Sequence, residues 1–145
     1  MTRILGLDVG DSRIGVAISD PIGVTTRGLF VYKRINIKTD MQKILEIIQE
    51  NECSKVVIGL PLNTSGEDSV QTTKVRAFAE RLGNTLRSNA MQEIVVILHD
   101  ERYSTIIAEE AMRENGASKE TIKANIDMRA AEVILQDYLE EHRDR

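Results

Sequence analysis

The sequence predicts an α/β fold built on a mixed five-stranded sheet with helices on both faces. Three observations lead to this prediction. Short apolar or alternating segments open the chain, and further on they alternate with longer segments whose apolar residues recur at helical spacing. Three strands in a meander followed by alternating strands and helices give a sheet that is antiparallel on one side and parallel on the other. The 145 residues, of which 41% are hydrophobic, suffice for one core, so we expect a single domain over residues 1–145.

The first three strands follow one another closely. The first ends near Asp8 and turns at residues 10–12 into a second strand over residues 13–19, where apolar residues alternate with polar or small ones. A turn at residues 20–23 leads into a third strand over residues 24–32, which is rich in Val, Thr, Phe and Tyr. An antiparallel meander is therefore expected at the start of the chain.

Helices and buried strands alternate in the rest of the chain. A capping box at Thr39 predicts the start of a helix that ends near Asn51. The later elements are a strand over residues 55–59, a helix with Val75, Phe78 and Leu82 on one face, a strand over residues 94–98, a helix from Ser104 to Gly116, and a final helix over residues 126–142.

Composition limits the classes of protein. The chain has 23 acidic and 19 basic residues, a net charge of -4 and a pI of about 5.3, so a nucleic-acid partner would need a local basic edge. The single Cys53 excludes an internal disulfide, and no segment is typical of a signal peptide or a membrane span. We therefore expect a soluble, cytoplasmic protein without a membrane partner.

Asp8 is the most informative residue, because it places a carboxylate in an apolar strand. An isolated buried carboxylate takes up a proton, pairs with a cation or binds a metal. A turn-forming role before Gly10, Asp11 and Ser12 is the alternative interpretation.

Further acids are expected at the same edge of the sheet. Asp100 and Glu101 follow a parallel strand, and the carboxyl ends of such strands meet at one edge. Asp127 lies in line with Ala130 and Ile134 on the core-facing stripe of the last helix. Each acid has a structural alternative, since Asp127 can stabilise a helix N-terminus and Asp100 or Glu101 can cap the next helix.

Together these acids predict a metal site. Carboxylates that converge without a cation repel one another, whereas one or two Mg²⁺ or Mn²⁺ ions would keep them ionised. The absence of a Cys/His cluster from the sequence argues against zinc. Such a site suits phosphoryl transfer by metal-assisted hydrolysis.

Several polar residues are candidates for contacts near this site. Arg13 and Arg102 can bind phosphate or pair with a neighbouring acid, and the loop from Asn63 to Gly66 can hold a phosphate with its N–H groups. His99 can shuttle protons or make a structural hydrogen bond.

Four ordered motifs resemble those of the bacterial YqgF/RuvX family, and the resemblance covers nearly the whole chain. The motifs are Leu7-Asp8-Val-Gly10-Asp-Ser-Arg13-Ile-Gly15, Gly59-Leu-Pro61-Leu-Asn63, His99-Asp100-Glu101-Arg102-Tyr-Ser104-Thr105, and Ile126-Asp127-Met-Arg-Ala130-Ala131. The resemblance implies an RNase H-like fold related to the RuvC resolvases. It also implies that Asp8 and Asp127 are metal ligands and catalytic residues. The middle ligand is then Glu101, with Asp100 as the second choice.

The family is described both as a Holliday junction resolvase and as the nuclease that matures the 5′ end of pre-16S ribosomal RNA. We therefore expect a metal-dependent endonuclease that binds pre-rRNA or branched DNA, and that associates with ribosomal particles, as a monomer or weak homodimer. A non-catalytic nucleic-acid-binding module is the second hypothesis, motivated by the low net basicity. A third, an ATPase, rests on the likeness of Asp8-Val-Gly10 to a phosphate loop, but the chain has the length of only one of the two domains required.

Overall fold

The computed structural model describes residues 2–101 and 119–142 of the chain. The strands in these ranges are β1 (Arg3–Val9), β2 (Arg13–Ser19), β3 (Thr26–Lys33), β4 (Cys53–Leu60) and β5 (Val95–Asp100). The helices are α1 (Ile37–Glu50), α2 (Val70–Ser88) and α4 (Lys119–Glu141). The helix predicted between Ser104 and Gly116 lies outside the described residues.

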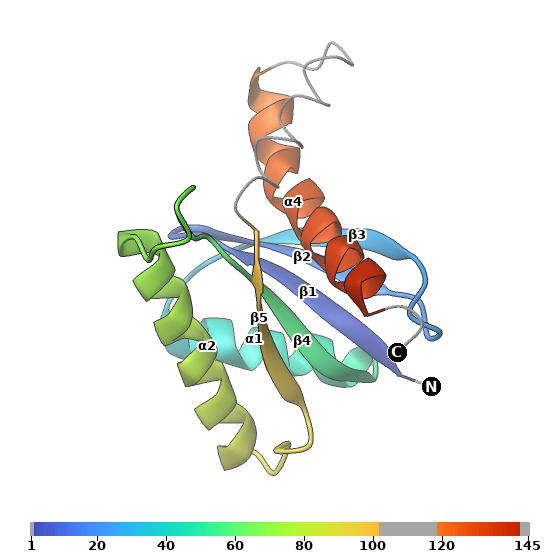
Figure 1. Ribbon diagram of the computed structural model, residues 1–145. Helices are drawn as coiled ribbons and strands as arrows, with labels where there is room; N and C mark the ends of the chain where they lie inside the picture. Colours follow the sequence, from blue (N-terminus) through green and yellow to red (C-terminus); the bar gives the residue numbers. More distant parts are fainter. Residues whose placement is uncertain (1, 102–118, 143–145) are drawn as a thin grey trace.

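All five described strands form one sheet in the order β3-β2-β1-β4-β5 (Figure 1). The pairs β1–β2 and β2–β3 are antiparallel, whereas β1–β4 and β4–β5 are parallel. The predicted antiparallel meander followed by parallel strands is confirmed. Since β1, β4 and β5 are parallel neighbours, their carboxyl ends lie at the same edge of the sheet, as the ligand-binding edge of such folds requires.

Helices cover both faces of the sheet (Figure 1). On one face, apolar residues of α1 and α2, such as Ile44 and Leu82, pack with Leu5, Leu7 and Ile58 into the larger part of the core. On the other face, α4 packs Ala131, Ile134, Leu135, Tyr138 and Leu139 against Ala17 and Val57. The last helix therefore lies directly on the central strands.

Glycines under α4 allow it to lie unusually close to the sheet. A Cβ atom at Gly15 of β2 would stand 1.8 Å from the main-chain oxygen of Asp127, and one at Gly28 of β3 would stand 2.5 Å from Cγ of Met128. Gly6 of β1 similarly faces Leu135 at 2.9 Å. Glycine in a strand interior is typical of such close approach, because any side chain would collide with the neighbouring helix.

Two helix boundaries differ from the sequence prediction. Helix α1 begins after Asn36, whose side chain accepts a hydrogen bond from the N–H of Thr39, so the predicted capping box at Thr39 is wrong. Helix α4 begins at Lys119, which places Asp127 well inside it rather than in its first turn. Stabilisation of a helix N-terminus consequently does not explain Asp127, since that effect is confined to the terminal turn.

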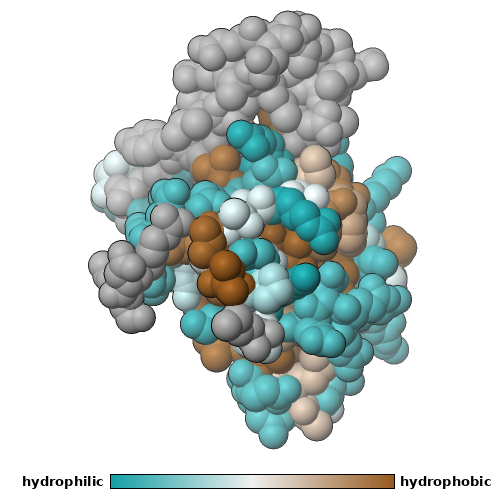
Figure 2. Space-filling model, turned by 90° about the vertical axis from the view of Figure 1, so that its right-hand side faces the viewer, coloured by the Kyte–Doolittle hydropathy of each residue, from teal (hydrophilic) through white to brown (hydrophobic). Residues whose placement is uncertain are grey.

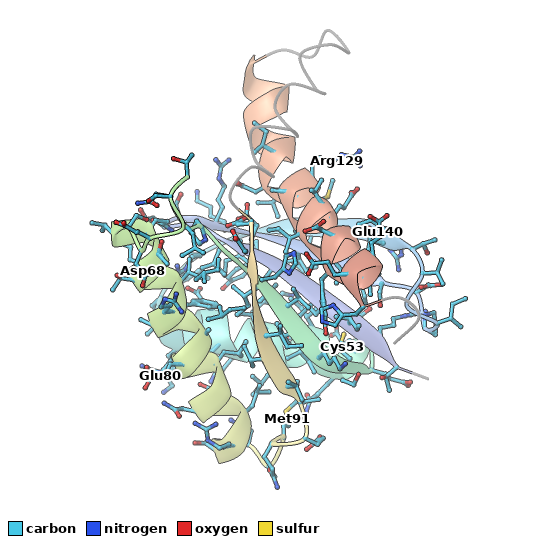
Figure 3. All side chains as sticks on the ribbon, viewed as in Figure 1. Cys53, Asp68, Glu80, Met91, Arg129 and Glu140 are labelled. Atoms are coloured by element: carbon cyan, nitrogen blue, oxygen red, sulfur yellow. The ribbon has the colours of Figure 1, made fainter. Side chains whose placement is uncertain are left out.

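In the coloured part of Figure 2, hydrophilic residues surround a hydrophobic patch near the middle of the face. Cys53, at the start of β4 (Figure 3), is buried, and burial raises the pKa of its thiol to about 11. Within the described residues, no helix has both the length and the apolar character needed to span a membrane.

The glycine contact predicts opposite effects for two substitutions. Gly15→Ala should lower the free energy of unfolding by about 3 kcal/mol or more, because its Cβ collides with the backbone of α4. Gly83→Ala is the matched control within α2, where the nearest contact is the flexible end of Arg87 at 3.6 Å, and it should raise stability by about 0.5–1 kcal/mol. Urea unfolding of both variants measures the difference, and a Gly15→Ala protein as stable as the wild type would contradict the packing.

Candidate active site

Asp8 occupies the penultimate position of β1, between the buried side chains of Leu7 and Val9. Side chains alternate along a strand, so Asp8 points to the opposite face from these two residues, the face that α4 covers. It lies opposite Gly15 in the β1–β2 pair, and the backbone of Asp127 lies over that glycine. Burial, and secondly the negative charge of Asp127, raise the pKa of Asp8 from 3.8 to about 7.

The main chain closes the turn that follows β1. The N–H of Gly10 donates to the carbonyl of Arg13 at 2.8 Å, which accounts for the turn without a role for the Asp8 side chain.

Asp127 reaches the site from α4 and forms an ion pair with Arg13 of β2. Nε of Arg13 lies 3.2 Å from Oδ2 of Asp127, and both side chains are partly exposed. Of the two roles considered for Arg13, the structure therefore shows the pairing with an acid. The guanidinium brings positive charge to a site that otherwise carries acids.

Glu101 comes from the end of β5. Its N–H donates to the carbonyl of Leu60 at 3.2 Å, and its carboxyl group lies over Gly59 of β4, where a Cβ atom would be 2.8 Å from Oε2. The same Cβ atom would be 2.5 Å from Ile134 of α4, so Glu101 lies on the face that α4 covers. Oε2 of Glu101 is buried, whereas Asp100 is exposed.

The three acids consequently occupy one face and one edge of the sheet. Leu7 pairs with Ile58 in the parallel β1–β4 register, and the next residues along are Asp8 and Gly59, over which Glu101 lies. The ligand atoms of these three acids do not all lie within 4.8 Å of one another, however. Among the described residues, the one group of three metal-ligating side chains whose ligand atoms all lie within 4.8 Å of one another is His99, Asp137 and Glu141.

The donor set of Asp8, Glu101 and Asp127 fits a hard divalent cation. All three offer carboxylate oxygens, the ligands that Mg²⁺ and Mn²⁺ favour. A cation would relieve the repulsion by which Asp127 raises the pKa of Asp8. Gly59 leaves room for the Glu101 carboxyl group beside the sheet.

The remaining predicted residues have separate places. Oδ1 of Asn63 accepts hydrogen bonds from the N–H groups of Ser65 and Glu67, and the N–H of Gly66 donates to the carbonyl of Asn63. These groups are used within the loop, which argues against the predicted phosphate cradle. Arg102 lies outside the described residues. Nε2 of His99 is 2.7 Å from Oδ2 of Asp137, in agreement with a structural hydrogen bond.

Arg34 and Asp40 support the turn that follows Asp8, and sequence reasoning missed both. Nη1 of Arg34 donates to the carbonyl of Gly10, and its main-chain N–H donates to the carbonyl of Ser12, each at 2.9 Å. Nε of Arg34 donates to the buried Asp40 of α1 at 2.9 Å. The signal was present, because Asp40 shares the buried face of α1 with Ile44 and Ile47, as Asp127 shares that of α4.

Asp40 is a well-satisfied buried carboxylate. Burial on its own would raise the pKa of Asp40, but hydrogen bonds from the N–H of Ile35, from Arg34 and from the hydroxyl of Tyr32 more than offset it and lower that pKa. Asp8 and Asp40 thus illustrate opposite environments. The donors around Asp40 stabilise its negative charge, whereas the charge of Asp127 makes ionisation of Asp8 more costly.

The sheet order, antiparallel then parallel, and the packing of α4 across the central strands define the class of protein: an RNase H-like fold of the kind found in junction-resolving nucleases. The structure is similar to that of Thermus thermophilus RuvC in complex with a Holliday junction substrate, with a TM-score of 0.61, 14% identity, and coverage of 99% of this chain and 97% of that one. It is also similar to the yeast mitochondrial Holliday junction resolvase Ydc2, with a TM-score of 0.57, 11% identity, and coverage of 99% and 82%.

The sequence model of the RuvX family, described as Holliday junction resolvase, matches residues 2–141, and the chain belongs to this family. Relatives named "Putative pre-16S rRNA nuclease" include those of Clostridium tetani, 44% identical over 95% of this chain and 96% of the relative, and Clostridioides difficile, 43% identical over 95% and 94%. The family and fold implied by the sequence motifs are confirmed.

The pKa of Asp8 predicts a pH-dependent stability difference. The unfolded chain loses this proton near pH 3.8 and the folded protein near pH 7, so Asp8 destabilises the fold progressively between these values and fully above them. Asp8→Asn should therefore raise the free energy of unfolding by roughly 2 kcal/mol or more at pH 8, and leave it nearly unchanged at pH 4. Urea unfolding in EDTA at both pH values measures this effect, and an equal gain at pH 4 would refute the assignment.

A second pair of substitutions tests the support of the turn. Asp40→Ala should cost about 3–5 kcal/mol of unfolding free energy, because it leaves Arg34 without its buried partner. Asp68→Ala removes the exposed partner of Arg76 just before α2 (Figure 3) and should leave the free energy of unfolding close to that of the wild type. Denaturation of both variants at pH 7 compares them, and similar losses would contradict a structural role for the Asp40 contacts.

Proposed function

We propose that this chain is a metal-dependent endonuclease that hydrolyses phosphodiester bonds in the maturation of the 5′ end of pre-16S ribosomal RNA. The observation that carries the proposal is the position of Asp8, Asp127 and Glu101 on one face at the carboxyl end of β1. The names of the curated relatives support the choice of pre-16S rRNA as the substrate. The RuvX family to which the chain belongs supports the reaction class.

The carboxylates of Asp8, Glu101 and Asp127 would hold Mg²⁺ or Mn²⁺. A bound ion of this kind supplies activation of the attacking water and stabilisation of the leaving oxygen. Asp8 contributes from the rigid centre of the sheet and Asp127 from α4, so their separation depends on the packing at Gly15. We favour Glu101 over Asp100 as the third ligand, because Glu101 lies over Gly59 and Asp100 is exposed.

Arg13 would act on the substrate side of the site. Its guanidinium is partly exposed and next to Asp127, so it can contact a phosphate of the scissile strand while remaining close to the metal ligands. A site with a local cation explains how a chain of net charge -4 binds a polyanion. Arg102 is a further candidate for a substrate contact, whereas the hydrogen bonds that Asn63 accepts within its own loop argue against that role for Asn63.

The test is a cleavage assay on a pre-16S leader RNA and, in parallel, a four-way DNA junction, each with and without Mg²⁺. Cleavage of the RNA should require Mg²⁺ and fall by roughly a hundredfold or more in Asp8→Asn and Asp127→Asn, because each substitution removes an ionised ligand. Asp68→Asn is the matched control, since it changes an exposed acid that pairs with Arg76 on α2. Asp100→Asn and Glu101→Gln compare the two candidates for the third ligand.

Undiminished cleavage by Asp8→Asn would overturn the assignment of the metal ligands. Preferential cleavage of the junction would favour the alternative, a junction-resolving DNA endonuclease, which the description of the RuvX family supports. Mg²⁺ binding without cleavage of either substrate would favour a non-catalytic nucleic-acid-binding module. A two-fold junction would suit a homodimer, whereas a single RNA cut needs one active site.

A further inference from the structure

A second cluster of metal-ligating side chains joins β5 to the C-terminal part of α4. It consists of His99 on β5 and of Asp137 and Glu141 on α4, and one ligand atom from each residue lies within 4.8 Å of the others. We propose that this cluster binds a divalent transition-metal ion such as Zn²⁺. The cluster shares no residue with the three acids discussed above: Asp137 follows Asp127 by ten residues, or about 15 Å along the helix, whereas His99 precedes Glu101 by two residues on β5.

His99 is held in position before any ligand binds. Its side chain is buried, with 8% of the residue exposed, and its ring stacks on that of Tyr138 at a centroid distance of 6.1 Å and an interplanar angle of 24°. Tyr138 is itself buried against the sheet. An imidazole fixed in this way loses little conformational freedom on binding, which favours affinity.

The two carboxylates can adjust around this fixed ring. Asp137 and Glu141 are four residues apart and therefore share one face of α4, and both side chains are more than half exposed. Oδ2 of Asp137 lies 2.7 Å from Nε2 of His99, and Oε2 of Glu141 lies 3.8 Å from Nδ1. Ligand atoms on one tetrahedral ion are roughly 3.3 Å apart. Rotation of the exposed Glu141 side chain towards Nε2 would bring all three groups around one ion.

The ligand types select the ion. Imidazole nitrogen is a good ligand for Zn²⁺, Co²⁺ and Ni²⁺, whereas Mg²⁺ favours oxygen ligands only. One imidazole and two carboxylates satisfy three positions of a tetrahedral ion and leave the fourth for water. The alternative is an ion pair of His99 with the two acids, which needs no metal and predicts no binding.

An ion at this position would fasten β5 to α4. The strand leads directly into Glu101, and the helix carries Asp127, so both elements contribute to the proposed nuclease site. Binding should therefore stabilise the fold independently of Mg²⁺ and independently of cleavage.

The test is a titration of tag-free protein with Zn²⁺, and with Co²⁺ as a spectroscopic substitute, in the absence of Mg²⁺. The wild type should bind one equivalent, develop the visible absorption of Co²⁺ bound by nitrogen and oxygen, and show a higher Tm with Zn²⁺. Asp137→Asn and Glu141→Gln should each weaken binding by about tenfold or more, since even the loss of an indirect partner costs that much. Both residues are exposed, so these variants should keep the fold.

Two controls separate this site from others. Glu140→Gln changes an exposed neighbour on the same turn of α4 (Figure 3), and Asp8→Asn changes the proposed nuclease site; both should bind like the wild type. In NMR spectra, Zn²⁺ should shift the imidazole signals of His99 more than those of His142, the other histidine of the chain. Absence of binding, binding that Asp137→Asn and Glu141→Gln leave unchanged, or binding lost in Asp8→Asn would overturn the proposal.

Discussion

The contact between the backbone of α4 and Gly15 is the constraint on which the candidate active site depends. Gly15 lies opposite Asp8 in the sheet and beneath Asp127 in the helix, so a single residue without a side chain sets the separation of the two acids. The same close approach raises the pKa of Asp8, because it buries this carboxylate and brings the charge of Asp127 near it. The packing that holds α4 against the sheet is thus also what brings the two acids together at a site suited to a cation.

In this arrangement the ionised form of Asp8 is unfavourable, and binding of a cation would remove that electrostatic cost. Asp40 shows that the chain can satisfy a buried acid fully when the role is structural, with Arg34, Tyr32 and Ile35 as donors. Asp8 has the opposite environment, since burial and the like charge of Asp127 both raise its pKa. Perturbed carboxylates of this kind are common at functional sites, and the contrast within one protein identifies Asp8 as the exception.

The sequence predicted the order and direction of the strands, because alternating apolar residues and short turns are local signals. It also predicted that Asp127 faces the core, because Asp127, Ala130 and Ile134 recur at helical spacing. It did not predict that α4 begins at Lys119, since the sequence of residues 117–125 is compatible with either a loop or a helix. The contact of Glu101 with Gly59 and the cluster around His99 depend on tertiary packing, which no local pattern records. The glycines within β1, β2 and β3 were a sequence signal that a helix lies close to the sheet, but they were not interpreted in this way.

The contacts along α4 have a consequence for how this family can tolerate insertions and deletions. The helix meets Gly15 at Asp127, accepts the N–H of Gly28 on the side chain of Glu132, and reaches His99 at Asp137. One inserted residue rotates everything beyond it by about 100°. An insertion between Asp127 and Asp137 would therefore break at least one of these contacts. Length variation among relatives should accordingly be absent from this stretch of the helix.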